Sequence, residues 1–206
     1  MPESIDLKNS ADSHPAPQGT TSPAARYLID ARISRFTVRA FASGMFSAFG
    51  HSPTIAIRDL AGEARFSPDM LESASLHVTI KAASLGVTDD ISDKDRREIE
   101  REMQESVLES AKYPEVVYDC SRVSVSNPGN GQYSITMLGN LTLHGVTSGL
   151  TIPARVALTG DMLRAYGEFS LRQSDYNIKL VSAMGGGLKV KDEVKLSFDI
   201  VARKQE

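Results

Sequence analysis

The sequence lacks three features: a second cysteine, a long run of apolar residues and a cluster of basic residues. Because Cys120 is alone, the chain cannot form an internal disulfide, which fits a reducing compartment. A membrane-spanning helix needs about 18 successive apolar residues, and no such run occurs, so we expect no transmembrane segment. The N-terminus has no basic start followed by an apolar core, so we expect no secretory signal and a cytoplasmic protein.

The basic residues are too dispersed to form a surface for nucleic acid. Lysine and arginine together number 23 against 26 acidic residues, and the net charge is -3. Proteins that bind nucleic acid gather positive charge on one face or along one stripe. We therefore expect no nucleic-acid partner.

The 206 residues divide into a polar N-terminal tail and one domain. Residues 1–25 are rich in proline, serine, threonine and alanine, and they hold few large apolar groups to offset the entropy of ordering. We predict a flexible tail over 1–25. We predict a single folded domain over 26–206, because an all-β chain of this length ordinarily forms one core.

Most of the domain alternates apolar and polar residues with the period of a β-strand. In the most regular segment, Val194, Leu196, Phe198 and Ile200 face one way and the residues between them are polar. Short turns join such segments, which favours an antiparallel meander over a parallel sheet. A meander removes its free edges by closing, so we predict an all-β protein with a closed antiparallel barrel of about eight strands. A two-sheet sandwich has the same alternation and stays open as an alternative.

One stretch, 92–112, breaks the alternation and has helical spacing instead. Ser92 is a suitable N-cap, and Pro114 forbids continuation of a helix that ends near Lys112. We expect the apolar stripe of this helix to cover one end or flank of the barrel, while its acidic residues stay in water. The stripe consists of Ile99, Met103, Val107, Leu108 and Ala111.

Seven segments in chain order together resemble the YceI-like family. Each segment is weakly specific alone, and the ordered set is fairly specific. The segments are YLID at 27–30, G-x-F-x-x-F at 44–49, GEARFSPD at 62–69, ASLHVTIKAASL at 74–85, the helix leading into YPEVVYDCSRV at 113–123, GNLTLHGVT at 139–147 and KVKDEVKLSFDIVA at 189–202.

The resemblance implies a lipocalin-like barrel with a helical insertion. Family members have been associated with binding long polyisoprenoid chains, including polyprenyl quinones, in the barrel interior, and many of them are periplasmic. The function implied is that of a non-enzymatic lipid-binding protein. The residues expected to line the ligand site are Phe36, Val38, Phe46, Phe49, His51, Val78, Met103, Leu143, His144, Phe169 and Phe198.

An alternative function keeps the barrel but fills its interior. A solidly packed barrel would act as an interaction or stress-response module without a ligand. On either interpretation we expect no cofactor. A polyprenyl lipid is the one bound molecule that the resemblance admits, and a homodimer is left open.

A hydrolase or metalloenzyme ranks last, because no nucleophile, base and orienting group occur in a recognisable pattern. His51, His77 and His144 lack the paired spacing of metal ligands, so we predict no metal site. A turn role is favoured for His51 and His144, which are also candidates for polar groups near a barrel mouth. The segment LRQSDYNI at 171–178 fits either a polar mouth or a hydrogen-bonded turn, and the sequence does not decide between them.

Overall fold

The structure is a computed structural model that describes residues 24–43, 52–67, 70–129, 131–183 and 188–205. Its strands are β1 (Ala25–Ile29), β2 (Arg35–Arg39), β3 (Ala42–Ser43), β4 (Thr54–Ile57), β5 (Leu60–Phe66), β6 (Ser75–Lys81), β7 (Leu85–Val87), β8 (Glu115–Gly129), β9 (Gln132–Leu143), β10 (Val146–Thr159), β11 (Met162–Arg172), β12 (Ser182–Ala183), β13 (Leu188–Val190) and β14 (Glu193–Gln205). Its helical segments are η2 (Leu71–Ser73), η3 (Ala82–Ser84), α1 (Asp93–Glu102), η4 (Met103–Val107) and η5 (Gln173–Tyr176).

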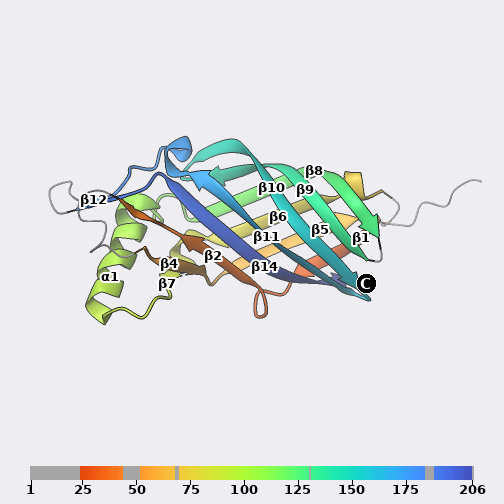
Figure 1. Cartoon of the computed structure of the whole chain (residues 1–206), viewed down its shortest axis with the longest axis horizontal. Helices are drawn as coiled ribbons and strands as arrows, with labels where there is room; N and C mark the ends of the chain where they lie inside the picture. Colours follow the sequence, from red (N-terminus) through yellow and green to blue (C-terminus); the bar gives the residue numbers. More distant parts are fainter. Residues whose placement is uncertain (1–23, 44–51, 68–69, 130, 184–187, 206) are drawn as a thin grey trace, which may run out of the picture.

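Eight strands form a closed antiparallel ring in the order β1-β5-β6-β8-β9-β10-β11-β14 (Figure 1). The ring closes because β14 pairs with β11 along one edge and with β1 along the other. The predicted closed antiparallel barrel is therefore confirmed, and the sandwich is excluded. Beside the ring, β12, β13 and β3 form a small separate sheet.

Strands β2, β4 and β7 extend three of the barrel strands toward one end. β14 pairs with β2 over Lys195–Asp199 and with β1 over Ala202–Gln205 along the same edge, so β2 continues the line of β1. In the same way β4 runs on into β5 and β6 into β7. β8 pairs with β6, and within the described residues it does not pair with β7. The barrel wall is therefore open beside β7 at this end.

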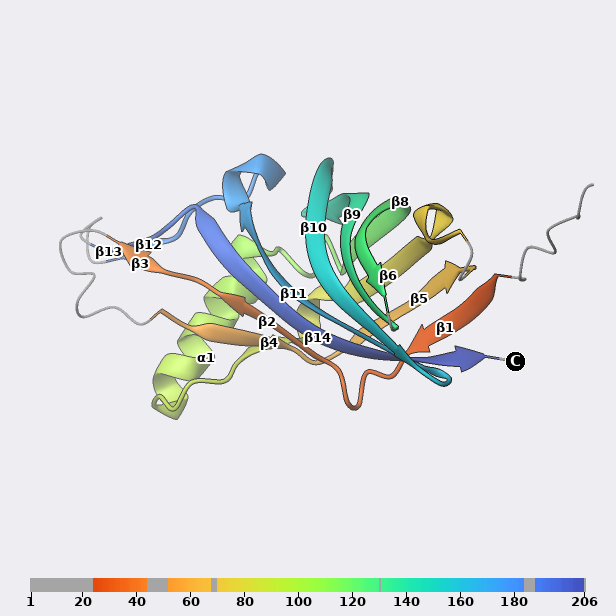
Figure 2. The same cartoon turned by 45° about the vertical axis from the view of Figure 1, so that its right-hand side comes forward.

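Helix α1 covers the free edge of β7. It lies at the end of the barrel opposite the C-terminus (Figure 1), and a second view also places it next to β4 (Figure 2). Side chains of α1 and of the following turn η4 bind the backbone of the edge strand: Arg96 of α1 donates to the carbonyl of Val87 at 2.5 Å, and Gln104 of η4 donates to the carbonyl of Leu85 at 3.2 Å. These bonds satisfy polar groups that a free strand edge would otherwise expose.

The start of α1 agrees with the sequence, and its end does not. The Ser92 hydroxyl accepts a hydrogen bond from the backbone N–H of Asp95 at 3.1 Å, which confirms the predicted N-cap. The prediction that the helix runs to Lys112 is wrong. α1 ends at Glu102 and continues as the π-helical turn η4, after which Glu109 adopts a left-handed backbone with φ of 44°.

The π-helical turn changes which residues share the apolar stripe. The backbone N–H of Leu108 donates to the carbonyl of Met103 at 2.8 Å, five residues earlier, and both side chains are buried in the same apolar core. Ala111, which a regular α-helix would have placed on this stripe, is exposed.

The end of the barrel away from α1 is closed by a small apolar cluster. The rings of Tyr27 and Phe66 stack at 5.0 Å between centroids with an interplanar angle of 11°. Leu163 and Ala202 complete this cluster, and all four residues are buried.

Candidate functional site

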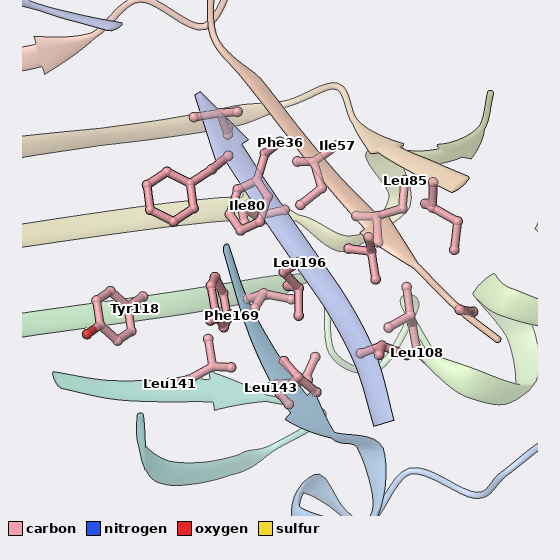
Figure 3. Close-up of a pocket in the computed structure, with 18 of the residues that line it drawn as sticks. Phe36, Ile57, Ile80, Leu85, Leu108, Tyr118, Leu141, Leu143, Phe169 and Leu196 are labelled. Atoms are coloured by element: carbon pink, nitrogen blue, oxygen red, sulfur yellow. The ribbon is translucent and has the colours of Figure 1, made fainter. Parts of the chain in front are cut away.

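The barrel encloses an apolar cavity of about 690 Å³. This volume falls within the ~300–1,000 Å³ typical of small-molecule sites. Side chains from strands on opposite sides of the barrel and from the end of the helix point into the same space (Figure 3). Strand β14 shows how alternation builds the wall, because every second residue along it lines the cavity. These residues are Val194, Leu196, Phe198, Ile200 and Ala202.

Three phenylalanines from different strands form one part of the wall. The ring centroid of Phe36 lies 6.0 Å from that of Phe198 and 6.4 Å from that of Phe169, and the rings are tilted or edge-on. Phe169 and Phe198 are 6.3 Å apart. Aromatic rings favour such tilted contacts, so the three side chains support one another around the cavity.

Tyr118 adds another ring to the wall, and its hydroxyl is already engaged. The hydroxyl lies within hydrogen-bonding distance of the carbonyls of Leu150 at 3.2 Å and Met137 at 3.3 Å. Burial raises the pKa of the Tyr118 phenol above its usual value, so the proton is retained. The ring passes so close to Gly139 that a Cβ there would lie 2.7 Å from it. Tyr118 is therefore a wall residue whose polar group is satisfied by the barrel itself.

The other polar residues of the cavity lie at its α1 end. Within the described residues, four charged side chains of α1 line this end: Asp95, Glu98, Arg101 and Glu102. Ser182 of β12 and Gln173 of η5 complete the polar lining. The cavity is therefore amphipathic along its length, with a polar rim at α1 and an apolar interior beyond it.

Gln173 is the one buried member of this polar rim. It is 8 % exposed, and its backbone N–H donates to the carbonyl of Asp192 at 3.0 Å, next to the start of β14. Its side-chain Nε2 donates to the carbonyl of Lys191 at 2.9 Å and reaches that of Asp192 at 3.4 Å. Since carbonyls only accept, these contacts identify the nitrogen of the amide. The segment 171–178 thus forms both a hydrogen-bonded turn and part of a polar mouth.

Seven of the eleven residues expected to bind a ligand line the cavity. Phe46, Phe49 and His51 lie outside the described residues. His144 is not part of the cavity lining. The binding role of all eleven residues stays a prediction. The seven that line the cavity are Phe36, Val38, Val78, Met103, Leu143, Phe169 and Phe198.

His144 instead joins three segments behind the cavity wall. Its Nδ1 contacts the carbonyl of Tyr176 at 3.2 Å, and its ring packs on Tyr113 at 4.5 Å between centroids. Its Nε2 lies 2.9 Å from Glu109 Oε2, an electrostatic contact that is not aligned as a hydrogen bond. His144 and Glu109 both have positive φ, at 52° and 44°. These contacts place His144 in a hydrogen-bonded turn between β9 and β10.

Sequence reasoning did not single out Tyr118 as a lining residue, and it considered Gln173 only as part of the possible polar mouth at 171–178, although the alternation contained both. The inward series of β11 ends at Leu171, and Gln173 is the next residue with the same parity. Tyr118 likewise follows Val116 along β8. Both residues could have been found from the sequence, because each continues a series of inward-facing apolar residues along its strand.

A chain of three side chains on the outside of the barrel has the connectivity of a hydrolytic triad. Asp119 Oδ1 lies 2.6 Å from His77 Nδ1, and Thr79 Oγ1 lies 3.1 Å from His77 Nε2. The side chains of His77 and Asp119 are more than half exposed. Asp119 and His77 are cross-strand neighbours of β8 and β6, on the face opposite the cavity. The arrangement is therefore a surface hydrogen-bond chain on a sheet, and it does not share the cavity.

Metal sites and membrane-spanning helices are both absent from the described part of the chain. It holds no group of three or more histidine, cysteine, aspartate or glutamate residues that could bind a metal ion. None of the helices in these residues combines the length and the apolar character needed to cross a membrane.

Solved structures with the same fold come from several bacteria. BcnA of Burkholderia cenocepacia superposes with a TM-score of 0.62 at 20 % identity, covering 84 % of this chain and 98 % of BcnA. A polyisoprenoid binding domain of Saccharophagus degradans, implicated in plant cell wall breakdown, gives 0.62 at 14 % identity over 87 % of this chain and 98 % of that domain. The YCEI protein of Campylobacter jejuni gives 0.54 at 19 % identity over 74 % and 85 %. At these identities the likeness concerns the fold.

Sequence comparison identifies the family directly. No curated protein matched the chain. The family model of the YceI-like domain, however, matches residues 27–202, which is most of the chain and nearly all of the barrel. The protein therefore belongs to the YceI-like family.

Proposed function

We propose that this protein binds a polyisoprenoid chain in the interior of its barrel. The observation that carries the proposal is the barrel cavity of about 690 Å³, whose lining is mostly apolar away from the α1 end. The name of the Saccharophagus degradans domain, a polyisoprenoid binding domain with the same fold, adds support. An unfilled interior also speaks against the solidly packed alternative, because a barrel core normally excludes voids.

The distribution of polar residues sets the direction of the chain. Beyond the rim the lining is aliphatic and aromatic, and the hydroxyl of Tyr118 is taken up by wall carbonyls. The far end is closed by the cluster around Tyr27 and Phe66. A ligand with one polar end therefore enters tail first and leaves its head at α1.

The length of the cavity limits the tail to about four isoprene units. β14 lines it from Val194 to Ala202, which is about 26 Å along the strand and about 20 Å along the axis of a barrel with tilted strands. An extended isoprene unit adds roughly 5 Å, given a carbon–carbon bond of about 1.5 Å. The volume of about 690 Å³ also lies within the ~300–1,000 Å³ typical of small-molecule sites.

Burial energy makes such a tail sufficient for binding. Each five-carbon unit gains roughly 4 kcal/mol when it leaves water, at about 0.8 kcal/mol per carbon. Association costs on the order of 4 to 15 kcal/mol. One unit does not repay this cost, whereas four units do.

Displacement of a fluorescent apolar dye by geranylgeraniol, a four-unit prenol, tests the proposal. The matched variants are Ala165→Phe, which fills the deep part of the cavity, and Ala61→Phe, which adds the same ring to an exposed position on β5. We expect displacement in the wild type and in Ala61→Phe, and a loss of at least tenfold in affinity in Ala165→Phe. Equal affinity in all three proteins would place the ligand elsewhere.

A further inference from the structure

The buried amide of Gln173 presents an acceptor to the cavity. Its nitrogen is fixed by the carbonyls of Lys191 and Asp192, at 2.9 Å and 3.4 Å. Gln173 lines the cavity, and its Oε1 atom accepts no hydrogen bond from the described residues. A buried acceptor without a donor is costly.

The rest of the rim also carries more hydrogen-bond acceptors than donors, so it favours a ligand that donates. Among the described lining residues, the charged groups of the rim are three carboxylates, those of Asp95, Glu98 and Glu102, and one guanidinium, that of Arg101. Glu98 and Glu102 form no ion pair with any described residue. An anionic head group would meet net negative charge here, and a head group with acceptors only would leave Gln173 unsatisfied.

We propose that the cavity selects a ligand whose head group is a hydrogen-bond donor without negative charge, such as an alcohol or an amine, and that Gln173 Oε1 receives this hydrogen bond. This inference rests on the proposed function, because it concerns the head of a chain held in the same cavity. It favours a prenol over a prenyl phosphate and over a quinone, whose ring oxygens only accept.

Three ligands that share the same geranylgeranyl tail separate the contribution of the head group to affinity from that of the tail. Geranylgeraniol has a hydroxyl donor, its methyl ether keeps the oxygen without the donor, and geranylgeranyl phosphate carries negative charge. We expect the alcohol to bind roughly two- to tenfold more tightly than the ether, the range of one neutral hydrogen bond. We expect the phosphate to bind more weakly than the alcohol. Equal binding of alcohol and ether, or tighter binding of the phosphate, overturns the inference.

Two variants test whether Gln173 causes the preference for the alcohol over the ether. Gln173→Met removes the acceptor and should bind alcohol and ether equally. Ser174→Ala is the control: it removes the 2.7 Å hydrogen bond to Asp192 in the same turn and leaves the amide in place, so the preference should persist. A Gln173→Met protein that keeps the full preference overturns the role of Gln173.

A measurement on the wild type covers the case in which Gln173→Met does not fold. In ¹⁵N-labelled protein the side-chain amide signal of Gln173 should shift more with the alcohol than with the ether. The same shift with both ligands counts against the inference. If neither ligand binds at all, it is the proposed function that fails.

Discussion

Glu100 Oε1 accepts a hydrogen bond from the backbone N–H of Val87 at 2.8 Å. Val87 is fully buried, at 0 % exposure, and belongs to the strand where the barrel wall opens. A helix side chain thus takes the place that a neighbouring strand would fill. This bond, with those of Arg96 and Gln104, holds α1 and η4 against the cavity.

Loss of this bond should loosen the helix. In Glu100→Ala the N–H of Val87 loses its partner in a buried position, and we expect the free energy of unfolding to fall by about 1–3 kcal/mol. Urea denaturation measures the change. Glu98→Ala is the control, because Glu98 lies exposed on the same helix, and its effect should stay within about 0.5 kcal/mol. Equal effects of the two variants would show that the bond to Val87 contributes nothing.

Two strand glycines give a matched test of the barrel wall. In Gly139→Ala the new Cβ collides with the ring of Tyr118 and the carbonyl of Asp119, so we expect a loss of about 1–3 kcal/mol of stability. Gly149 on the neighbouring strand has open space, with no atom within 4 Å of the point that a Cβ would occupy. Gly149→Ala should be neutral or stabilise by up to about 1 kcal/mol. Thermal unfolding distinguishes them, and similar melting temperatures contradict the contact with Tyr118.

The apolar stripe of the helix should be intolerant of charge. Met103 is 7 % exposed and lines the cavity. Met103→Asp should lower the free energy of unfolding by about 3 kcal/mol or more, or expose the interior to a hydrophobic dye. Met103→Leu, close in volume, should cost less than about 1.5 kcal/mol. An unchanged melting temperature without dye binding in Met103→Asp would show that the helix does not cover the interior.

Asp192 should make the turn that holds Gln173 sensitive to acid. Hydrogen bonds from the Ser174 hydroxyl and backbone N–H, and then the charge of Arg172, lower the pKa of Asp192 below its usual value. The unfolded chain therefore binds the proton first, so this contribution to stability is complete above about pH 5 and is lost as pH falls below about 4.

The measurement is the difference in unfolding free energy between the wild type and Asp192→Asn at a series of pH values. The difference should be constant from about pH 5 to 8 and shrink below about pH 4. A difference that does not change with pH would mean that the carboxylate gains nothing from its partners.

The sequence predicted the barrel well because burial on one face imposes a period of two on every strand. Along β14 the alternation identified Val194, Leu196, Phe198 and Ile200, and all four line the cavity. This alternation shows which side chains face inward, but it does not reveal whether they meet across the barrel or leave a space. The cavity therefore depends on side-chain volumes summed over many strands, which no single segment contains.

The helical insertion shows a second limit of sequence reasoning. Its start at Ser92 follows from local capping chemistry. Its end is marked by the π-helical turn, in which the N–H of Leu108 bonds to the carbonyl of Met103, and by one tertiary contact: the left-handed Glu109 meets His144 from a distant hairpin. Neither contact leaves a periodic signal, so the regular α-helical spacing extended the prediction too far.

The most direct measurement of the central claim is the affinity of the wild type for prenols of increasing length. Farnesol, with three units, should bind more weakly than geranylgeraniol, with four, and chains beyond about five units should gain no further affinity because the cavity is full. Isothermal titration calorimetry in a mild detergent gives these constants. A rise in affinity that stops at four to five units is the result we predict, and an absence of binding at every length would contradict the account.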